Sequence, residues 1–107
     1  MSTPVTHPEA TAEFLDAVAY YEDKQDGLGE RFRRNAAGAV ADVQDNPEAW
    51  PKLPGWDRDP VVRSRGIEGF PYRVVYFLMH KAPMLVAFAH DKRRPRYWAR
   101  RIRDLTN

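Results

Sequence analysis

Apolar residues recur at helical spacing along two segments in the first half of the chain. In the first segment the apolar positions are Ala10, Phe14, Ala17, Val18 and Tyr21, which follow the i, i+4, i+7, i+8, i+11 pattern of one helical face. Thr6 and Glu9 fit a capping box at the start of this segment, and Pro8 suits a first helical turn. The pattern predicts an amphipathic helix that ends at the sequence QDGLG.

The second apolar stripe predicts another helix. It consists of Leu28, Phe32, Ala36, Ala39, Val40 and Val43. Asn46 and Pro47 end the helix, because proline cannot continue the hydrogen-bond ladder and restricts the residue before it. Only a short glycine-containing turn joins the two helices, so they are expected to form an antiparallel hairpin.

Residues 47–60 contain four prolines and one glycine and show neither helical nor strand periodicity. They are predicted to form a connecting loop. Trp50 and Trp56 are expected to anchor this loop to the core, with a stacking contact to a ligand as the alternative.

Three runs rich in valine, tyrosine and phenylalanine follow the loop. They are VVRSRGI, FPYRVVYFLM and MLVAFAH, and short turn-like segments separate them. These runs predict three antiparallel strands. Together with the helices they predict an α+β fold in one domain spanning residues 1–107, with the antiparallel helical hairpin packed on the sheet.

The expected register of the last two strands places two functional side chains together. A hairpin centred between Lys81 and Ala82 puts Arg73 opposite His90, on the sheet face that also carries Val75. The helical hairpin is expected to cover one face of the sheet. The other face would remain a partly apolar surface that ends in Arg73 and His90.

More basic and aromatic residues surround this predicted pair. Arg63 and Arg65 share one face of the preceding strand. The residues that follow His90 include Arg93, Arg94, Arg96, Tyr97 and Trp98. Several cations, one imidazole and one phenol are therefore expected to converge where a phosphate could bind.

The charge of the chain is segregated along its length. The net charge of the 107 residues is only +2, yet residues 1–57 carry 5 Lys/Arg against 11 Asp/Glu and the remainder carries 12 against 4. A basic half of this kind attracts polyanions, either nucleic acid or an acidic partner segment. A merely solvated surface is the alternative.

Other classes of protein find no support in the sequence. The chain has no cysteine, no signal-like apolar start and no run of about 18 apolar residues, so a cytoplasmic protein without a membrane span is expected. His7, His80 and His90 lie in separate contexts without metal-ligand spacing, so neither a metal nor a cofactor is expected. Glu13 and Asp16 are expected to be solvated.

The order of these segments resembles the RelE/ParE superfamily of bacterial type II toxins. The resemblance covers roughly residues 5–101 and is carried by AEFLDAVAYYEDKQDGLGERF, NPEAWP, RSRGIEGFPYRVVY and VAFAHDKRRPRYW. It implies two helices followed by an antiparallel sheet of three to four strands, in which TPVTH would supply an extra N-terminal strand.

The resemblance also implies a function. Such a protein inhibits growth and is neutralised by a cognate antitoxin, an acidic DNA-binding protein. ParE-like members poison DNA gyrase by binding, whereas RelE-like members cleave mRNA on the ribosome. The segment AHDKR is similar to the C-terminal ending of ParE-like toxins, and this reading is favoured here. For binding, contacts are expected from Arg63, Arg65, Arg94, Arg96, Tyr97 and Trp98.

The ribonuclease alternative requires a base for the ribose 2′-OH, an acid for the leaving oxygen, and cations for the phosphate. The resemblance implies Arg73, His90, Arg93 and Tyr97 as the catalytic residues. Arginine is a poor base because its pKa exceeds about 12, so His90 would have to supply that function. A structural His90 that caps the strand end remains the alternative, and a non-catalytic nucleic-acid-binding module is the third possibility.

Overall fold

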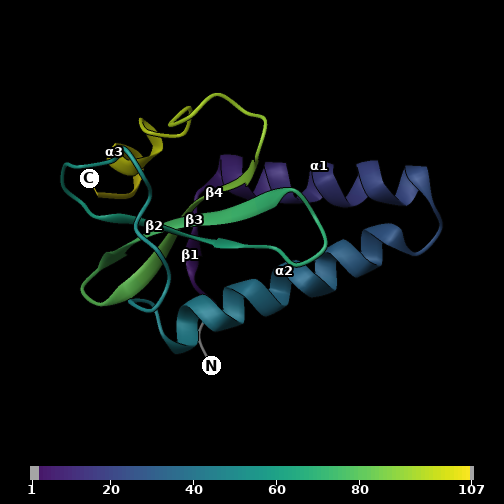
Figure 1. Cartoon of the computed structure of the whole chain (residues 1–107), viewed down its shortest axis with the longest axis horizontal. Coiled ribbons are helices and arrows are strands. Elements are labelled where there is room, and N and C mark those ends of the chain that lie inside the picture. The colour runs from purple at the N-terminus through teal and green to yellow at the C-terminus, as the bar shows by residue number, and fades with distance from the viewer. Residues whose placement is uncertain (1–2, 107) are drawn as a thin grey trace.

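A mixed four-stranded sheet lies at the centre of the fold, with a helical hairpin packed on one face (Figure 1). The structure is a computed structural model and describes residues 3–106. The elements in chain order are β1 (Val5–Thr6), α1 (Pro8–Lys24), α2 (Leu28–Asp45), β2 (Val62–Gly66), β3 (Tyr72–Met79), β4 (Ala82–His90) and α3 (Arg101–Thr106). The two predicted helices and three predicted strands are confirmed.

An antiparallel sheet was expected, but the observed sheet is mixed. Its strand order is β1-β4-β3-β2; β2, β3 and β4 pair antiparallel, but β1 runs parallel to β4. The N-terminal strand lies in the expected segment. A strand of two residues carries no alternation from which its direction could be predicted.

The start of α1 differs in detail from the predicted capping box. His7, not Thr6, is the N-cap residue, and its Nδ1 accepts a hydrogen bond from the Glu9 main-chain N–H at 3.0 Å. Between the helices, Gly27 adopts a left-handed conformation with φ 86° that ends the turn. Gly29 then allows a close approach of the two helices, since a Cβ atom there would lie 2.5 Å from the Val18 carbonyl oxygen.

The register of β3 and β4 contradicts the expected pairing of Arg73 with His90. The turn is centred between His80 and Lys81, which both have left-handed backbone angles. A β-bulge then inserts Val86 as an unpaired residue of β4. As a result Arg73 pairs with Ala89, and Tyr72 pairs with His90.

The bulge changes which face each side chain occupies. Side chains alternate between the faces of a strand, so one extra residue moves every later side chain to the opposite face. Phe88 consequently packs with Val74 and Tyr76 in the core beneath the helices. His90 follows Phe88 on that face, whereas Arg73 lies on the opposite face with Val75.

The core beneath the helical hairpin is rich in aromatic side chains. Phe32 lies at its centre and contacts the rings of Phe14, Tyr21, Phe70 and Tyr72, with ring centroids 5.1–6.0 Å apart. Burying a side chain of this size stabilises the fold by about 1.5–3 kcal/mol. The aromatic residues of the two predicted apolar stripes, Phe14, Tyr21 and Phe32, therefore belong to the core.

The second face of the sheet is also covered, contrary to the expectation of an open surface. Leu53 and Trp56 from the loop pack there together with Trp98 and Ile102 from the C-terminal segment, residues 91–106. Figure 1 shows this segment, drawn in yellow, continuing from β4 and ending in α3 beside the loop. Helix α3 was not expected from the sequence. No helix within residues 3–106 is long and apolar enough to cross a membrane.

Candidate basic binding site

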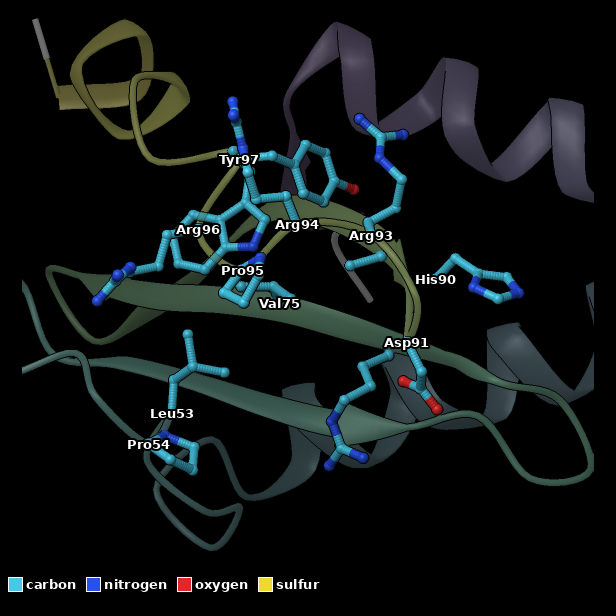
Figure 2. Close-up of a pocket in the computed structure, with 13 residues that line it drawn as sticks. Leu53, Pro54, Val75, His90, Asp91, Arg93, Arg94, Pro95, Arg96 and Tyr97 are labelled. Atoms are coloured by element: carbon cyan, nitrogen blue, oxygen red, sulfur yellow. The ribbon is translucent and has the colours of Figure 1, made fainter.

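A cleft of about 310 Å³ lies between the second face of the sheet and the C-terminal segment (Figure 2). Its lining residues are Leu53, Pro54, Arg73, Val75, Ala89, His90, Asp91, Arg93, Arg94, Pro95, Arg96, Tyr97 and Trp98. The loop and the sheet supply an apolar floor, and the C-terminal segment supplies a polar wall.

The cleft is electropositive. Arg93, Arg94 and Arg96 are exposed along one wall, which we call the arginine rim. Arg73 is half-buried and donates from Nε to the Ser64 hydroxyl at 2.9 Å. Among the lining residues only one, an aspartate at position 91, is acidic. Arginine guanidinium groups match the geometry of phosphate and carboxylate groups, so the cleft favours an anionic ligand.

Tyr97 is held inside the molecule by a carboxylate of α1. Its hydroxyl donates to Glu13 at 2.6 Å, and the Arg93 guanidinium lies 3.9 Å from the centre of its ring. Burial, together with the hydrogen bond and charge of Glu13, raises the pKa of Tyr97 well above its ordinary value of 10. The phenol is therefore a weak proton donor near neutral pH.

Glu13 was expected to be solvated, but it lies at the centre of a buried polar network. Its two carboxylate oxygens accept hydrogen bonds from Arg101 at 2.9 and 3.2 Å, from Tyr97, and from the Phe88 main-chain N–H at 3.2 Å. The side chains of Glu13 and Arg101 are only 15% and 7% exposed. Burial alone would lower the pKa of Arg101, but the hydrogen bond and charge of Glu13 outweigh it and raise that pKa.

A signal for this network was present in the sequence. Glu13 lies between Ala10 and Ala17 on the apolar face of the first helix, at i+3 and i−4 from these buried residues. A carboxylate in that position must find a partner when the face is buried. Its cationic partner comes from a segment 88 residues away, which no local pattern could indicate.

His90 makes contacts typical of a structural residue. Its Nδ1 accepts a hydrogen bond from the Lys92 main-chain N–H at 3.0 Å, and its ring packs edge-on against Tyr72 with centroids 5.0 Å apart. The main-chain hydrogen bond expected for a His90 that caps the strand end is therefore present. Figure 2 shows the ring pointing away from the group formed by Arg94 and Arg96.

Arg63 and Arg65 do not join the cleft. They lie on the helix-facing side of β2, where Arg63 donates to the Trp50 carbonyl oxygen at 2.8 Å. Arg65 forms an ion pair with Asp42 at 2.9 Å and lies over the ring of Trp50. The two arginines hold the loop against α2, and the predicted anchoring role of Trp50 is confirmed.

Trp98 is not an exposed contact residue, because only 3% of it is accessible. Its ring packs against Trp56 with centroids 5.3 Å apart, and Arg58 lies 4.2 Å from the centre of the Trp56 ring. The Arg93 guanidinium likewise stacks over the ring of Tyr97. The aromatic residues near the cleft therefore already have stacking partners within the chain.

Within residues 3–106, one group of side chains has a spacing compatible with a metal ion. Ligand atoms of His7, Glu9 and Asp104 lie within 4.8 Å of one another. Since His7 Nδ1 accepts the capping hydrogen bond, the ring proton belongs on Nε2, which lies 2.7 Å from Asp104. Nε2 is thus a donor to the carboxylate, and the group links the start of α1 to α3.

Comparison with known proteins adds no assignment. The chain matches no protein-family model, no curated protein and no solved structure. The cleft is lined by all but two of the predicted site residues: Arg73, His90, Arg93, Arg94, Arg96, Tyr97 and Trp98. Arg63 and Arg65 lie elsewhere, and Trp98 forms part of the buried floor.

Proposed function

We propose that this chain is a growth-inhibiting toxin of the RelE/ParE type that acts by binding its target, with DNA gyrase as the favoured target. The resemblance supplies the class of protein, and the helical hairpin on a sheet with an N-terminal strand agrees with it. The arginine-lined cleft supplies a surface for an anionic or acidic partner. The observation that carries the binding mode is that the two proton-transfer candidates bordering the cleft, His90 and Tyr97, are both already hydrogen-bonded within the chain.

Each candidate for proton transfer is already engaged. The Tyr97 hydroxyl donates to Glu13, and the rise in its pKa opposes loss of its proton. His90 also borders the cleft, but its Nδ1 accepts a main-chain hydrogen bond and its side chain projects from the sheet face opposite Arg73. The cleft thus offers cations that can bind and stabilise charge, whereas the groups that could act as base and acid are held in other hydrogen bonds.

The ribonuclease alternative retains one favourable observation. Arg73, Arg93 and Tyr97 border the same cleft, so a phosphate placed there would contact two guanidinium groups beside a phenol. A stacking nucleic-acid module is less favoured, because Arg93 and Arg58 already lie over the rings of Tyr97 and Trp56.

A cognate antitoxin remains part of the proposal. The electropositive cleft supports an acidic neutralising segment, since exposed arginines and carboxylates attract each other. The apolar sheet face no longer supports it, because the chain's own C-terminal segment covers that face. Binding of an acidic protein at the cleft should therefore weaken when salt is raised.

The test is to induce the chain in growing bacteria and to follow DNA damage and mRNA integrity in the same culture. We expect growth arrest and an SOS response with intact mRNA, both lost when Arg93 and Arg94 are replaced by glutamine. Replacing Arg31 and Arg34 of α2 by glutamine removes the same charge outside the cleft and should leave the arrest intact.

Other outcomes discriminate between the candidates. Rapid mRNA cleavage that is abolished by Tyr97→Phe would replace gyrase binding with the ribonuclease function. Normal growth of cells that accumulate folded protein would overturn the toxin proposal itself. Salt-sensitive binding of purified protein to isolated single-stranded RNA, without growth arrest, would favour the nucleic-acid-binding module.

A further inference from the structure

The outer side of α1 carries an exposed stripe that lies outside both cores; within it, Tyr20 contacts Tyr21 edge-on, and Lys24 Nζ lies 5.1 Å from the centre of the Tyr20 ring. The stripe consists of Ala12, Leu15, Asp16, Ala19, Tyr20 and Asp23, which we call the acidic stripe. These positions follow the i, i+3, i+4, i+7, i+8, i+11 spacing of one helical face. Leu15 and Tyr20 are 58% and 56% exposed, and they are two of the four large hydrophobic side chains exposed within residues 3–106. A second apolar stripe on a helix indicates a contact with another surface.

The charge of the stripe is negative and unpaired. Asp16 and Asp23 form no ion pair with any residue of the part of the chain described by the structure. By contrast, Glu9 and Glu13 of the same helix are directed to the arginines of the C-terminal segment. The acidic stripe is therefore an exposed apolar surface with a net negative charge.

The acidic stripe adjoins the arginine rim. A small cleft of about 200 Å³ is lined by both Asp16 and Arg93. Figure 2 shows the side chain of Arg93 directed toward α1, and in Figure 1 the segment that follows β4 lies beside the first half of this helix. The rim itself has an apolar floor next to it, which includes Leu53 and Val75.

Two adjacent patches of opposite charge are complementary to themselves under a two-fold rotation. In a two-fold interface the same surface is used by both subunits, so the acidic patch of one copy meets the basic patch of the other twice. We propose that two copies of this chain form a two-fold dimer in which each acidic stripe lies on the partner's arginine rim. Leu15 and Tyr20 supply the apolar contact, and Asp16 and Asp23 supply charges that match Arg93 and Arg94.

The dimer has a consequence for the cleft. It covers the arginine rim of both copies, so a dimeric chain cannot present that rim to any other partner. Self-association and binding of an anionic target are then mutually exclusive, and the monomer is the competent form. The dimer follows from the two patches alone and does not rest on the proposed toxin function.

The experiment measures molar mass in solution by light scattering after size exclusion and by sedimentation. The wild-type chain should have twice the monomer mass at low ionic strength and dissociate as salt is raised. Two variants, Asp16→Lys/Asp23→Lys and Arg93→Glu/Arg94→Glu, should each have half the wild-type mass. Mixed in equal amounts, they should form a 1:1 heterodimer, because one then offers two basic patches and the other two acidic patches.

Matched variants test whether the position of the charge matters. Arg31→Glu/Arg34→Glu makes the same charge change on α2 and should leave the mass unchanged. Leu15→Ser keeps every charge and should weaken the dimer by loss of the apolar contact. Circular dichroism verifies that each variant is folded. If a charge variant is unfolded, the loss of the dimer is measured with Leu15→Ser instead.

Several results would overturn the dimer. The first is a wild-type chain that is monomeric at tens of micromolar in low salt. The second is a failure of Asp16→Lys/Asp23→Lys and Arg93→Glu/Arg94→Glu to form a heterodimer. The third is a loss of the wild-type dimer in Arg31→Glu/Arg34→Glu that equals the loss in the other two charge variants. Growth of the mass beyond a dimer would indicate head-to-tail contacts instead. Retention of the dimer in the charge variants would place the interface elsewhere. None of these masses depends on whether the chain inhibits growth.

Discussion

Replacing Glu13 by alanine is expected to lower the free energy of unfolding by about 3–5 kcal/mol, because it removes the hydrogen-bonded counter-ion of the buried Arg101 guanidinium and leaves only the longer ion pair with Glu9 at 3.8 Å. The Arg101 side chain is only 7% exposed, and Glu13 accepts two of its hydrogen bonds. The same substitution removes the acceptors of Tyr97 and of the Phe88 main-chain N–H. Since a domain of this size is stable by about 5–15 kcal/mol, the loss should be a large fraction of the total.

The partner substitution tests the physical reason. Glu13→Leu and Arg101→Met should each destabilise the fold as well, but the double variant Glu13→Leu/Arg101→Met should lose less than these two single losses combined. Replacing both members of a buried pair by apolar groups leaves no uncompensated charge. Glu48→Ala removes an exposed carboxylate from the loop that follows α2 and should change the stability by no more than about 0.5 kcal/mol.

The assay is urea unfolding, followed by circular dichroism and by tryptophan fluorescence, since Trp56 and Trp98 both pack in the second core. The midpoint and slope give the free energy of unfolding for each variant. A loss below about 1 kcal/mol for Glu13→Ala would show that the network is a surface pair of little value. Strict additivity of Glu13→Leu and Arg101→Met would likewise refute the argument from an unpaired buried charge.

Four further substitutions test other parts of the fold. Burial and a hydrogen bond to a carboxylate raise the pKa of Tyr97 above 10, so the stability it contributes is fully present below about pH 10 and is lost as the pH rises through the higher folded value. Urea unfolding at about pH 8 and about pH 11 should therefore show a smaller alkaline loss for Tyr97→Phe than for the wild type. Trp98→Ala should lower the free energy of unfolding by about 3–5 kcal/mol, because it leaves a cavity in the core on the second face of the sheet. A melting temperature close to that of the wild type would contradict this placement of Trp98. Gly29→Ala should destabilise the fold by about 1–3 kcal/mol, since its Cβ would overlap a main-chain oxygen of α1. Gly38→Ala meets open space and should stabilise the fold by about 0.5–1 kcal/mol. Equal melting temperatures for the two variants would contradict both predictions.

The helical part of the fold was predictable because its signals are local. The apolar stripe of residues 28–43 and the proline at position 47 determine α2, which spans Leu28–Asp45. The positions of β2, β3 and β4 could likewise be predicted from three apolar runs. The register of β3 and β4 could not be predicted, because the bulge at Val86 depends on how the two strands pack against the separate cores on the two faces of the sheet.

The candidate site was less predictable because its parts come from distant segments. The contact of Glu13 with Arg101 joins two ends of the chain, and charge patterns along a sequence do not specify such pairs. The C-terminal segment was interpreted from its many arginines as an exposed surface. Trp98, Ile102 and Leu105 nevertheless follow the i, i+4, i+7 spacing of an apolar face, which could have indicated that this segment packs on the sheet.

The covering of the second sheet face by residues 91–106 has a consequence for the order of events during synthesis. The ribosome makes β2, β3 and β4 before it makes Trp98 and Ile102, so the nascent sheet has an uncovered apolar side for a time. A chaperone that recognises apolar strands would find its binding site in that interval. A message truncated upstream of codon 98 would yield a product in which this side stays open, and such a product should be cleared by proteases rather than accumulate.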